Sequence, residues 1–185
     1  RVLRHSGQHR HFAVDCYSCP IFNIKPFKGA LALKPRMIAV SDYKAFSVVL
    51  ADKVAHVVIN RPDKVNAMNA DFWCEIIEIF RWADDTDEVR AVVISGAGKH
   101  FSSGIDLMML ASLGSQMGPD VGRNAEKLRR KILDLQASFN AVDNCRKPVL
   151  AAIQGYCLGG AIDLISACDM RYSTVDAQFA IREID

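Results

Sequence analysis

The stretch GYCLGGAIDL, residues 155–164, places three glycines and a carboxylate at the junction of an apolar run and a helix-like run. Glycine loses more backbone freedom on folding than any other residue, so such a cluster needs a reason. The first turn of a helix has backbone N–H groups without an intrahelical partner, and the helix dipole adds partial positive charge there. Gly159 and Gly160 could therefore present donors to an anion, and Asp163 follows within the first turn.

Two kinds of anion suit this junction: a phosphate group, or an oxyanion formed during acyl chemistry. The phosphate motifs G-x-x-x-x-G-K-[ST] and G-x-G-x-x-G are absent from the sequence, as is the nucleophile motif G-x-S-x-G. A second loop, FSSGIDL at 101–107, also follows a predicted strand and enters an apolar helix. Two such loops could each supply one N–H to a single oxygen, which would stabilise an enolate or thioester oxyanion.

The elements that position these loops alternate between strands and helices. Strands are predicted at 46–50, 54–60, 90–96, 148–153 and 170–174. Helices are predicted at 71–85, 124–143 and 160–168, and 98–110 is a loop that enters a further helix. The first helix is expected to bury Phe72, Trp73, Ile76, Ile77, Phe80 and Ala83, and the second Leu128, Ile132, Leu135, Phe139 and Val142. This alternation predicts an α/β domain with mostly parallel strands.

Composition fits one domain of ordinary size. The chain has 185 residues, half of them hydrophobic, and a net charge of +2, which does not indicate a nucleic-acid partner. No apolar run reaches the roughly 18 residues of a membrane span. Four cysteines lie in apolar or helical surroundings, where a buried free thiol is usual: Cys74, Cys145, Cys157 and Cys168. We therefore expect a reducing compartment.

Residues 1–42 differ from the rest because they are basic and show no apolar period. We interpret them as a disordered extension that precedes a domain at 43–185; a transit peptide, or sequence upstream of a start at Met37, are alternatives. Potential zinc ligands are His9, His11, Cys16 and Cys19. Their spacing matches no zinc motif, so we predict no metal site.

Four blocks occur in order over residues 43–185: INRPDKVNAMN, VVISGAGKHFSSGIDL, KPVLAAIQGYCLGGAIDLISACDMRYST and AQFAIREID. Together they resemble the enoyl-CoA hydratase/isomerase (crotonase) superfamily. The resemblance implies a crotonase-like (ClpP/crotonase) α/β fold, a spiral of ββα units that packs into homotrimers or homohexamers. It implies an acyl-CoA thioester as substrate, no nucleic-acid or membrane partner, and no cofactor, since CoA is part of the substrate.

The same resemblance assigns roles to individual residues. Backbone N–H groups of Ile105 and Gly160 would hold the thioester oxygen, and Asp163 and Glu183 would be the catalytic acids. The implied substrate-binding residues are Ser103, Gly104, Ile105, Asp106, Leu107, Gly160 and Lys64. Structural alternatives remain for the charged ones: a helix-dipole partner for Asp163, a solvated charge for Glu183 or Lys64, and a first-turn structural acid for Asp106.

The two acids favour one branch of the superfamily. Hydratases have glutamates at both places, whereas aspartate at 163 with glutamate at 183 resembles the Δ3,5-Δ2,4-dienoyl-CoA isomerases. The implied reaction converts 3,5-dienoyl-CoA to 2,4-dienoyl-CoA in fatty-acid β-oxidation. In that branch the glutamate delivers a proton at C6, and a further aspartate takes the C2 proton. Alternatives are an enoyl-CoA hydratase and a non-catalytic paralogue that binds CoA esters.

The chain starts at Arg1 and stops at AIREID, so we expect the whole protein to continue and to supply the further aspartate. Without those residues, we expect the apolar side of helix 160–168 to be exposed. The expected compartment is the cytoplasm for a bacterial protein, and the mitochondrion or peroxisome otherwise.

Overall fold

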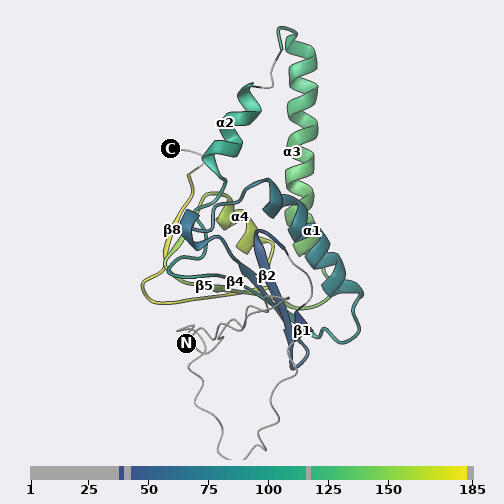
Figure 1. Ribbon diagram of the computed structural model, residues 1–185, viewed down its shortest axis with the longest axis vertical. Coiled ribbons are helices and arrows are strands. Elements are labelled where there is room, and N and C mark those ends of the chain that lie inside the picture. The colour runs from purple at the N-terminus through teal and green to yellow at the C-terminus, as the bar shows by residue number, and fades with distance from the viewer. Residues whose placement is uncertain (1–37, 40–42, 116–117, 183–185) are drawn as a thin grey trace, which may run out of the picture. The chain divides into compact units, whose positions relative to one another are not determined.

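The computed structural model describes residues 38–39, 43–115 and 118–182, all within one compact unit, Ala32–Asp185 (Figure 1). The four potential zinc ligands, nearly all of the basic extension 1–42, and Glu183 lie outside the described residues. Those predictions stay predictions. None of the helices within the described ranges is long and apolar enough to cross a membrane.

A six-stranded sheet with the order β1-β2-β3-β4-β5-β7 forms the centre of this unit (Figure 1). Its strands are β1 (Ile38–Ala39), β2 (Phe46–Ala51), β3 (Val54–Ile59), β4 (Ala91–Gly96), β5 (Val149–Ile153) and β7 (Met170–Ser173). The pairs β3–β4, β4–β5 and β5–β7 are parallel, whereas β1–β2 and β2–β3 are antiparallel. Parallel neighbours need a crossover connection, and helices supply it here. The α/β prediction is confirmed.

The hairpin between β2 and β3 closes through two residues, Asp52 and Lys53, because Ala51 pairs directly with Val54. Both turn residues have positive φ, 49° and 68°, as a type I′ hairpin turn requires. Burial alternates along both strands, so one face of the hairpin joins the core.

Helix α1 (Ala70–Asp85) begins where the sequence predicts. The Asn69 side chain caps it by accepting a hydrogen bond of 3.1 Å from the Phe72 amide. Its buried residues are Phe72, Trp73, Ile76, Ile79, Phe80 and Ala83. Ile77 is half-buried and packs against the core, and the buried Ile79 is an addition to the predicted set.

Helix α3 (Val121–Asp143) packs on α1 with its C-terminal half. Phe139 contacts Trp73 edge-on at 5.3 Å, and the Ser138 hydroxyl donates to the Trp73 carbonyl at 3.0 Å. Leu128 and Ile132, in its N-terminal half, are 40% and 44% exposed. The continuous apolar face predicted for this helix is therefore buried only in part. Helix α2 (Leu107–Ser115) and the start of α3 extend away from the sheet (Figure 1).

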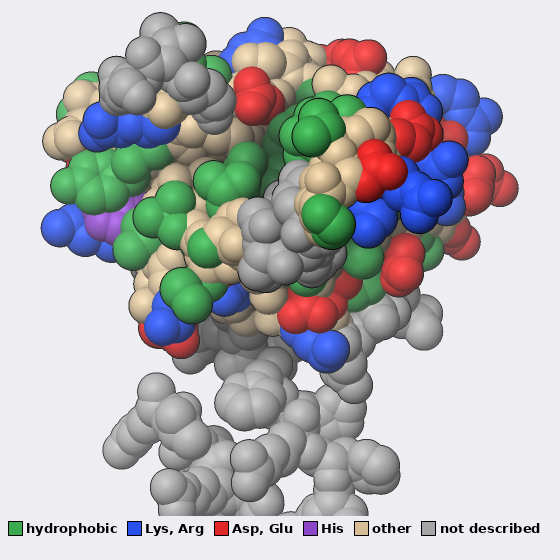
Figure 2. Space-filling model, turned by 90° about the horizontal axis from the view of Figure 1, so that it is seen from above, with side chains coloured by type: hydrophobic (Ala, Val, Ile, Leu, Met, Phe, Trp, Pro, Cys, Tyr) green, Lys and Arg blue, Asp and Glu red, His purple; other side chains and the backbone are tan. Residues whose placement is uncertain are grey.

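Helix α4 (Gly160–Ser166) corrects a prediction, because its apolar residues Ala161, Leu164 and Ile165 are buried. Exposed apolar side chains instead follow α4, and others lie on α2 and α3. Those after α4 are Met170, Tyr172, Val175, Phe179 and Ile181. In the view of Figure 2, hydrophobic side chains gather on the left, on the side of β8 (Gln178–Ala180), and charged side chains on the right, on the side of α3. The prediction of buried cysteines holds for Cys157 and Cys168 but was wrong for Cys74, which is exposed on α1.

Candidate active site

The two glycine loops meet at the carboxyl ends of β4 and β5, where parallel strands bring the segments that follow them to one edge of the sheet. Three backbone hydrogen bonds join the segments: Phe101 N to Gln154 O at 2.8 Å, Ser102 N to Tyr156 O at 3.0 Å, and Leu158 N to Ser102 O at 3.1 Å. Within the second segment, β6 (Tyr156–Leu158) pairs with β8 (Gln178–Ala180) as a two-stranded parallel sheet. The sequence did not predict these two short strands.

Backbone pairing with Met68 sets the direction of the Ile105 amide. Met68 N donates to Gly104 O at 2.8 Å, and Asp106 N donates to Met68 O at 3.1 Å. Since the residues on either side of Ile105 are bonded to Met68, Ile105 directs its own N–H to the opposite side. Among the described residues, none accepts a hydrogen bond from Ile105 N.

Gly160 lies on that opposite side, as the first residue of α4. A methyl group added at Gly160 would lie 3.8 Å from Ile105 N and 3.3 Å from Ile105 Cγ1. One added at Gly104, which has φ +84°, would lie 2.5 Å from Leu158 O and 3.1 Å from Gly160 N. The Gly160 amide donates no hydrogen bond to any residue that the structure describes. The glycines thus allow two unpartnered amides from separate loops to approach each other.

A buried asparagine, Asn66, supports this arrangement from beneath. Its Oδ1 accepts from Arg61 N at 2.9 Å, and its Nδ2 donates to Ala97 O at 2.9 Å and His100 O at 2.8 Å. The Ser102 hydroxyl donates to Asn66 O at 2.8 Å and lies 3.1 Å from the Gly104 amide, which donates to it. The sequence did not predict this network. The available signal was Asn66 itself, because asparagine tolerates its φ of 53° better than most residues do.

An ion pair between Arg61 and Asp106 flanks Ile105 on its C-terminal side. Arg61 Nη1 lies 3.2 Å from Asp106 Oδ2, and both side chains are 19% exposed. Asp106 Oδ1 accepts from the Met108 amide at 3.0 Å, at the start of α2. Burial alone would raise the pKa of Asp106, but hydrogen bonds from Arg61 and the Met108 amide outweigh it and lower that pKa. These contacts favour the structural alternative for Asp106.

A family model described as enoyl-CoA hydratase/isomerase matches residues 50–185. The chain belongs to the enoyl-CoA hydratase/isomerase family. A peroxisomal Δ(3,5)-Δ(2,4)-dienoyl-CoA isomerase of Arabidopsis thaliana is 45% identical over 80% of this chain and 55% of its own length. The mitochondrial enzyme of that name from Mus musculus is 49% identical over 82% of this chain and 47% of its own length.

Solved structures confirm the crotonase-like fold. An enoyl-CoA hydratase/carnithine racemase from Magnetospirillum magneticum superposes with a TM-score of 0.67 at 29% identity. The superposition covers 77% of this chain and 50% of that one. The chain therefore spans about half the length of the relatives it matches.

Of the two acids implied by the family resemblance, the structure describes one. Asp163 lies exposed in the first turn of α4, three residues after Gly160. Glu183 follows β8 and lies outside the described residues. No group of three or more His, Cys, Asp or Glu side chains within the described ranges could hold a metal ion.

The substrate-binding residues predicted for this family member lie around the same loop. Ser103 N donates to Val65 O at 3.0 Å, which places the exposed Lys64 beside this loop. Lys64 ends the short helix η3 (Pro62–Lys64). Leu107, the first residue of α2, is 76% exposed. All of these predicted residues therefore lie on or next to the segment that carries Ile105, apart from Gly160.

His100 is a further residue that the sequence analysis did not place in the site. Its ring stacks on Tyr156 at 4.1 Å, and its Nδ1 accepts from the Tyr156 amide at 3.1 Å. This bond requires an unprotonated Nδ1. Burial lowers the pKa of His100, and the neighbouring Lys99 lowers it further. His100 thus links the loop after β4 to the turn after β5 in its neutral form.

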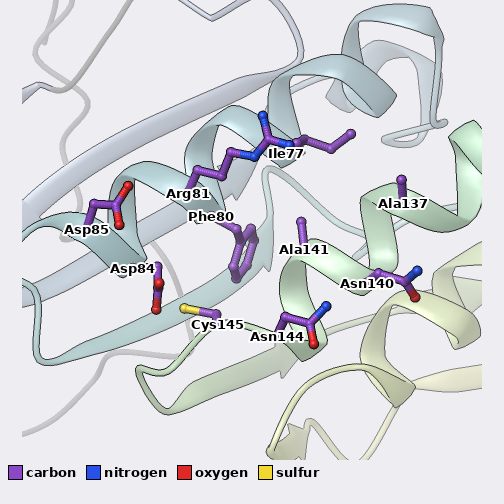
Figure 3. Close-up of a pocket in the computed structure, with 10 residues that line it drawn as sticks. All are labelled: Ile77, Phe80, Arg81, Asp84, Asp85, Ala137, Asn140, Ala141, Asn144 and Cys145. Carbon is purple, nitrogen blue, oxygen red and sulfur yellow. The ribbon is translucent and has the colours of Figure 1, made fainter.

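A separate cleft of about 330 Å³ lies between α1 and the end of α3 (Figure 3). Its apolar side is formed by Ile77, Phe80, Ala137 and Ala141, and its polar side includes Asp84 and Asn144. Arg146 pairs with Asp84 there, just before β5, whereas the glycine loops follow the carboxyl ends of the strands. Burial raises the pKa of the Cys145 thiol in this cleft. None of the predicted site residues lines it.

Proposed function

We propose that the whole protein isomerises 3,5-dienoyl-CoA to 2,4-dienoyl-CoA, with the thioester oxygen held between the amides of Ile105 and Gly160. The observation that carries the proposal is the approach of these two amides, each without a partner in the described part of the chain. The two relatives at 45% and 49% identity are dienoyl-CoA isomerases by name, which supports the isomerase over the hydratase alternative.

The proposed reaction removes one proton from the substrate at C2 and adds one proton at C6. A carboxylate base takes a C2 proton, and the electron pair moves into the conjugated system, so that the thioester oxygen carries negative charge. Two N–H groups directed at that oxygen stabilise the dienolate, and losing one such donor typically lowers kcat by about 10² to 10³. Protonation at C6 then completes the shift. The diene changes position without any change in oxidation state, so the proposal includes neither a redox cofactor nor a metal.

Carboxylate roles follow from the aspartate and glutamate at the two positions of the family's catalytic acids. We assign proton delivery at C6 to Glu183 and proton removal at C2 to an aspartate beyond Asp185 in the whole protein. Asp163, in the first turn of α4, is the other proposed acid of the site. Lys64 is proposed to contact the phosphates of CoA, because it is exposed beside the loop that carries Ile105.

The proposal extends to assembly and compartment. We propose a homotrimer or homohexamer for the whole protein, with neither nucleic acid nor membrane as a partner. The compartment proposed is the mitochondrion or peroxisome, where the names of the two relatives place them.

An absorbance assay on the whole protein tests the reaction. The protein is incubated separately with a 3,5-dienoyl-CoA and with a 2-enoyl-CoA, and the ultraviolet spectrum is followed. We expect the absorbance of a 2,4-dienoyl thioester to grow in, with slow or no loss of the 2-enoyl band. Faster hydration of the 2-enoyl ester would overturn the isomerase assignment in favour of a hydratase.

A further inference from the structure

The N–H of Ile105 can act on a thioester oxygen only if its backbone segment is held in one orientation. Pairing with Met68 sets that orientation, through the bonds of Gly104 and Asp106 on either side of Ile105. These bonds orient Ile105 only if the backbone of Met68 is itself fixed in place. The Trp73 indole helps by donating to Met68 O at 3.2 Å.

Arg61 contacts both backbone segments that take part in this pairing, the one that contains Met68 and the one that contains Ile105. Its Nη1 donates to the Ala67 carbonyl, one residue before Met68, and to Asp106 Oδ2 at 3.2 Å, one residue after Ile105. One guanidinium therefore ties the segment that orients Ile105 to the segment that carries it. Asp106 holds the same segment on its other side, because its Oδ1 accepts from Met108 N.

Burial separates this ion pair from the others. In the described part of the chain, every other ion pair has at least one side chain that is more than 60% exposed, whereas both members here are 19% exposed. Exposed pairs contribute little, whereas removing one partner of this partly buried pair leaves a charge that water solvates less well. Among the described residues, the least exposed ion pair therefore lies next to the Ile105 amide, which donates to none of those residues.

We propose that Arg61 and Asp106 are positioning residues that fix the direction of the Ile105 N–H toward the substrate carbonyl. This inference rests on the proposed function only in taking that carbonyl as the acceptor. Hydrogen-bond strength falls steeply with misalignment, so a small rotation of residues 104–106 weakens the donor without removing it. A role confined to folding, such as capping α2, would change stability and leave the carbonyl contact of the folded protein intact.

Infrared spectroscopy of a bound thioester separates the two roles. The probe is 2,4-hexadienoyl-CoA labelled with ¹³C at the thioester carbonyl, and the measurement is its stretching frequency when bound to the whole protein. Hydrogen bonds to a carbonyl lower that frequency. We expect a clear lowering in the wild type, and a return toward the free value in Arg61→Gln and Asp106→Asn. For the same variants we expect kcat to fall about 10- to 100-fold with KM within about threefold.

Matched variants control for charge and for folding. Arg146→Gln removes the arginine of the Arg146–Asp84 pair, at the opposite end of β5, and should leave the bound frequency unchanged. Arg61→Lys keeps the charge but not the planar fork, so it should give an intermediate frequency. If Arg61→Gln does not fold, Arg61→Lys and Asp106→Asn carry the test. In the double variant the loss should be smaller than the sum of the single losses, because both act on one contact.

Three results would test the positioning role of Arg61 and Asp106 and separate it from the proposed isomerase reaction. A wild-type frequency in folded Arg61→Gln and Asp106→Asn overturns the positioning role. An unshifted frequency in the wild type also overturns it, because the Ile105 amide would then not donate to the carbonyl. A lowered wild-type frequency that the variants lose, together with no conversion of 3,5-dienoyl-CoA, supports the positioning role and overturns only the proposed reaction.

Discussion

The two ends of the central strands are built differently. At the carboxyl ends of β4 and β5, glycines and a buried polar network bring together two amides that donate to no residue within the described ranges. At the other end, before β5, Arg146 forms a bidentate pair with Asp84, with contacts of 2.8 to 3.0 Å. That pair is shorter than the 3.2 Å contact of Arg61 with Asp106, yet its arginine is 71% exposed.

The difference shows that burial, rather than distance, indicates where the fold holds its geometry most firmly. Water screens the Arg146–Asp84 pair, so its short contacts add little to stability. Arg61 and Asn66 make contacts that water cannot easily replace, and each touches the backbone near Ile105 or its supports. The carboxyl end thus holds the Ile105 and Gly160 amides through partly or fully buried contacts, whereas the other end is joined by a solvent-exposed ion pair.

The strongest test of this comparison removes a proposed proton donor. Glu183→Gln keeps size and hydrogen-bonding capacity but removes the ionisable group. We expect turnover of 3,5-dienoyl-CoA to fall by about 10² to 10⁴, with CoA-ester affinity near wild type, because general acid–base catalysis contributes about that much. Asp84→Asn, at the opposite end, should leave turnover unchanged. Unaltered turnover in Glu183→Gln would show that this glutamate is a bystander.

A smaller effect is expected from closing the space between the two amides. The added methyl of Gly160→Ala would lie 3.3 Å from Ile105 Cγ1 and 3.8 Å from Ile105 N, where the substrate oxygen is proposed to sit. Gly160 has no positive φ, so the change introduces no backbone strain. We expect turnover to fall about 10- to 100-fold with a nearly unchanged Tm.

The matched control is Gly118→Ala, because an added methyl at Gly118 meets nothing within 4 Å. Its turnover should equal that of the wild type. Equal turnover in Gly160→Ala and Gly118→Ala would mean that the space between the amides is not where the substrate carbonyl binds.

Local signals predicted much of the fold, because they act within a few residues. The apolar spacing predicted a helix at 71–85, which is α1 (Ala70–Asp85), and the predicted strands at 46–50 and 54–60 form the hairpin. The two strands of the small sheet escaped prediction because each has three residues, and one is enclosed by glycines. Leu128 and Ile132 continue the apolar stripe of α3, but α1 covers only its C-terminal half.

The sequence indicated the two candidate donors, and it did not indicate the contacts that support them. Ile105 and Gly160 follow from glycine loops and from family resemblance, and the structure brings them together. The partner of Arg61 lies 45 residues away in Asp106, and those of Asn66 lie 31 and 34 residues away in Ala97 and His100. Contacts at such separations leave no periodic trace in one sequence, so they appear only once the chain is folded.

The smallest predicted effect is the pH dependence of Tm, which compares His56 on β3 with His100 in the loop after β4. Burial lowers the pKa of His56 on β3, partly offset by Asp52, and burial with Lys99 lowers that of His100 at the loop end. A lowered folded-state pKa means that the unfolded chain binds more protons, so the free energy of unfolding falls as pH drops below about 6.5 toward the folded pKa. We expect Tm to be a few degrees lower at pH 5.5 than at pH 7.5.

His100→Gln distinguishes the two histidines. Glutamine does not titrate, so the variant should lose the His100 share of the pH dependence and keep that of His56. Since protonated His100 cannot accept from the Tyr156 amide, the wild type should also lose turnover at pH 5.5 by more than its Tm change explains, and His100→Gln should not. A Tm that is the same at pH 7.5 and 5.5, or an identical loss of turnover in both proteins, would show that His100 does not support the candidate site in its neutral form.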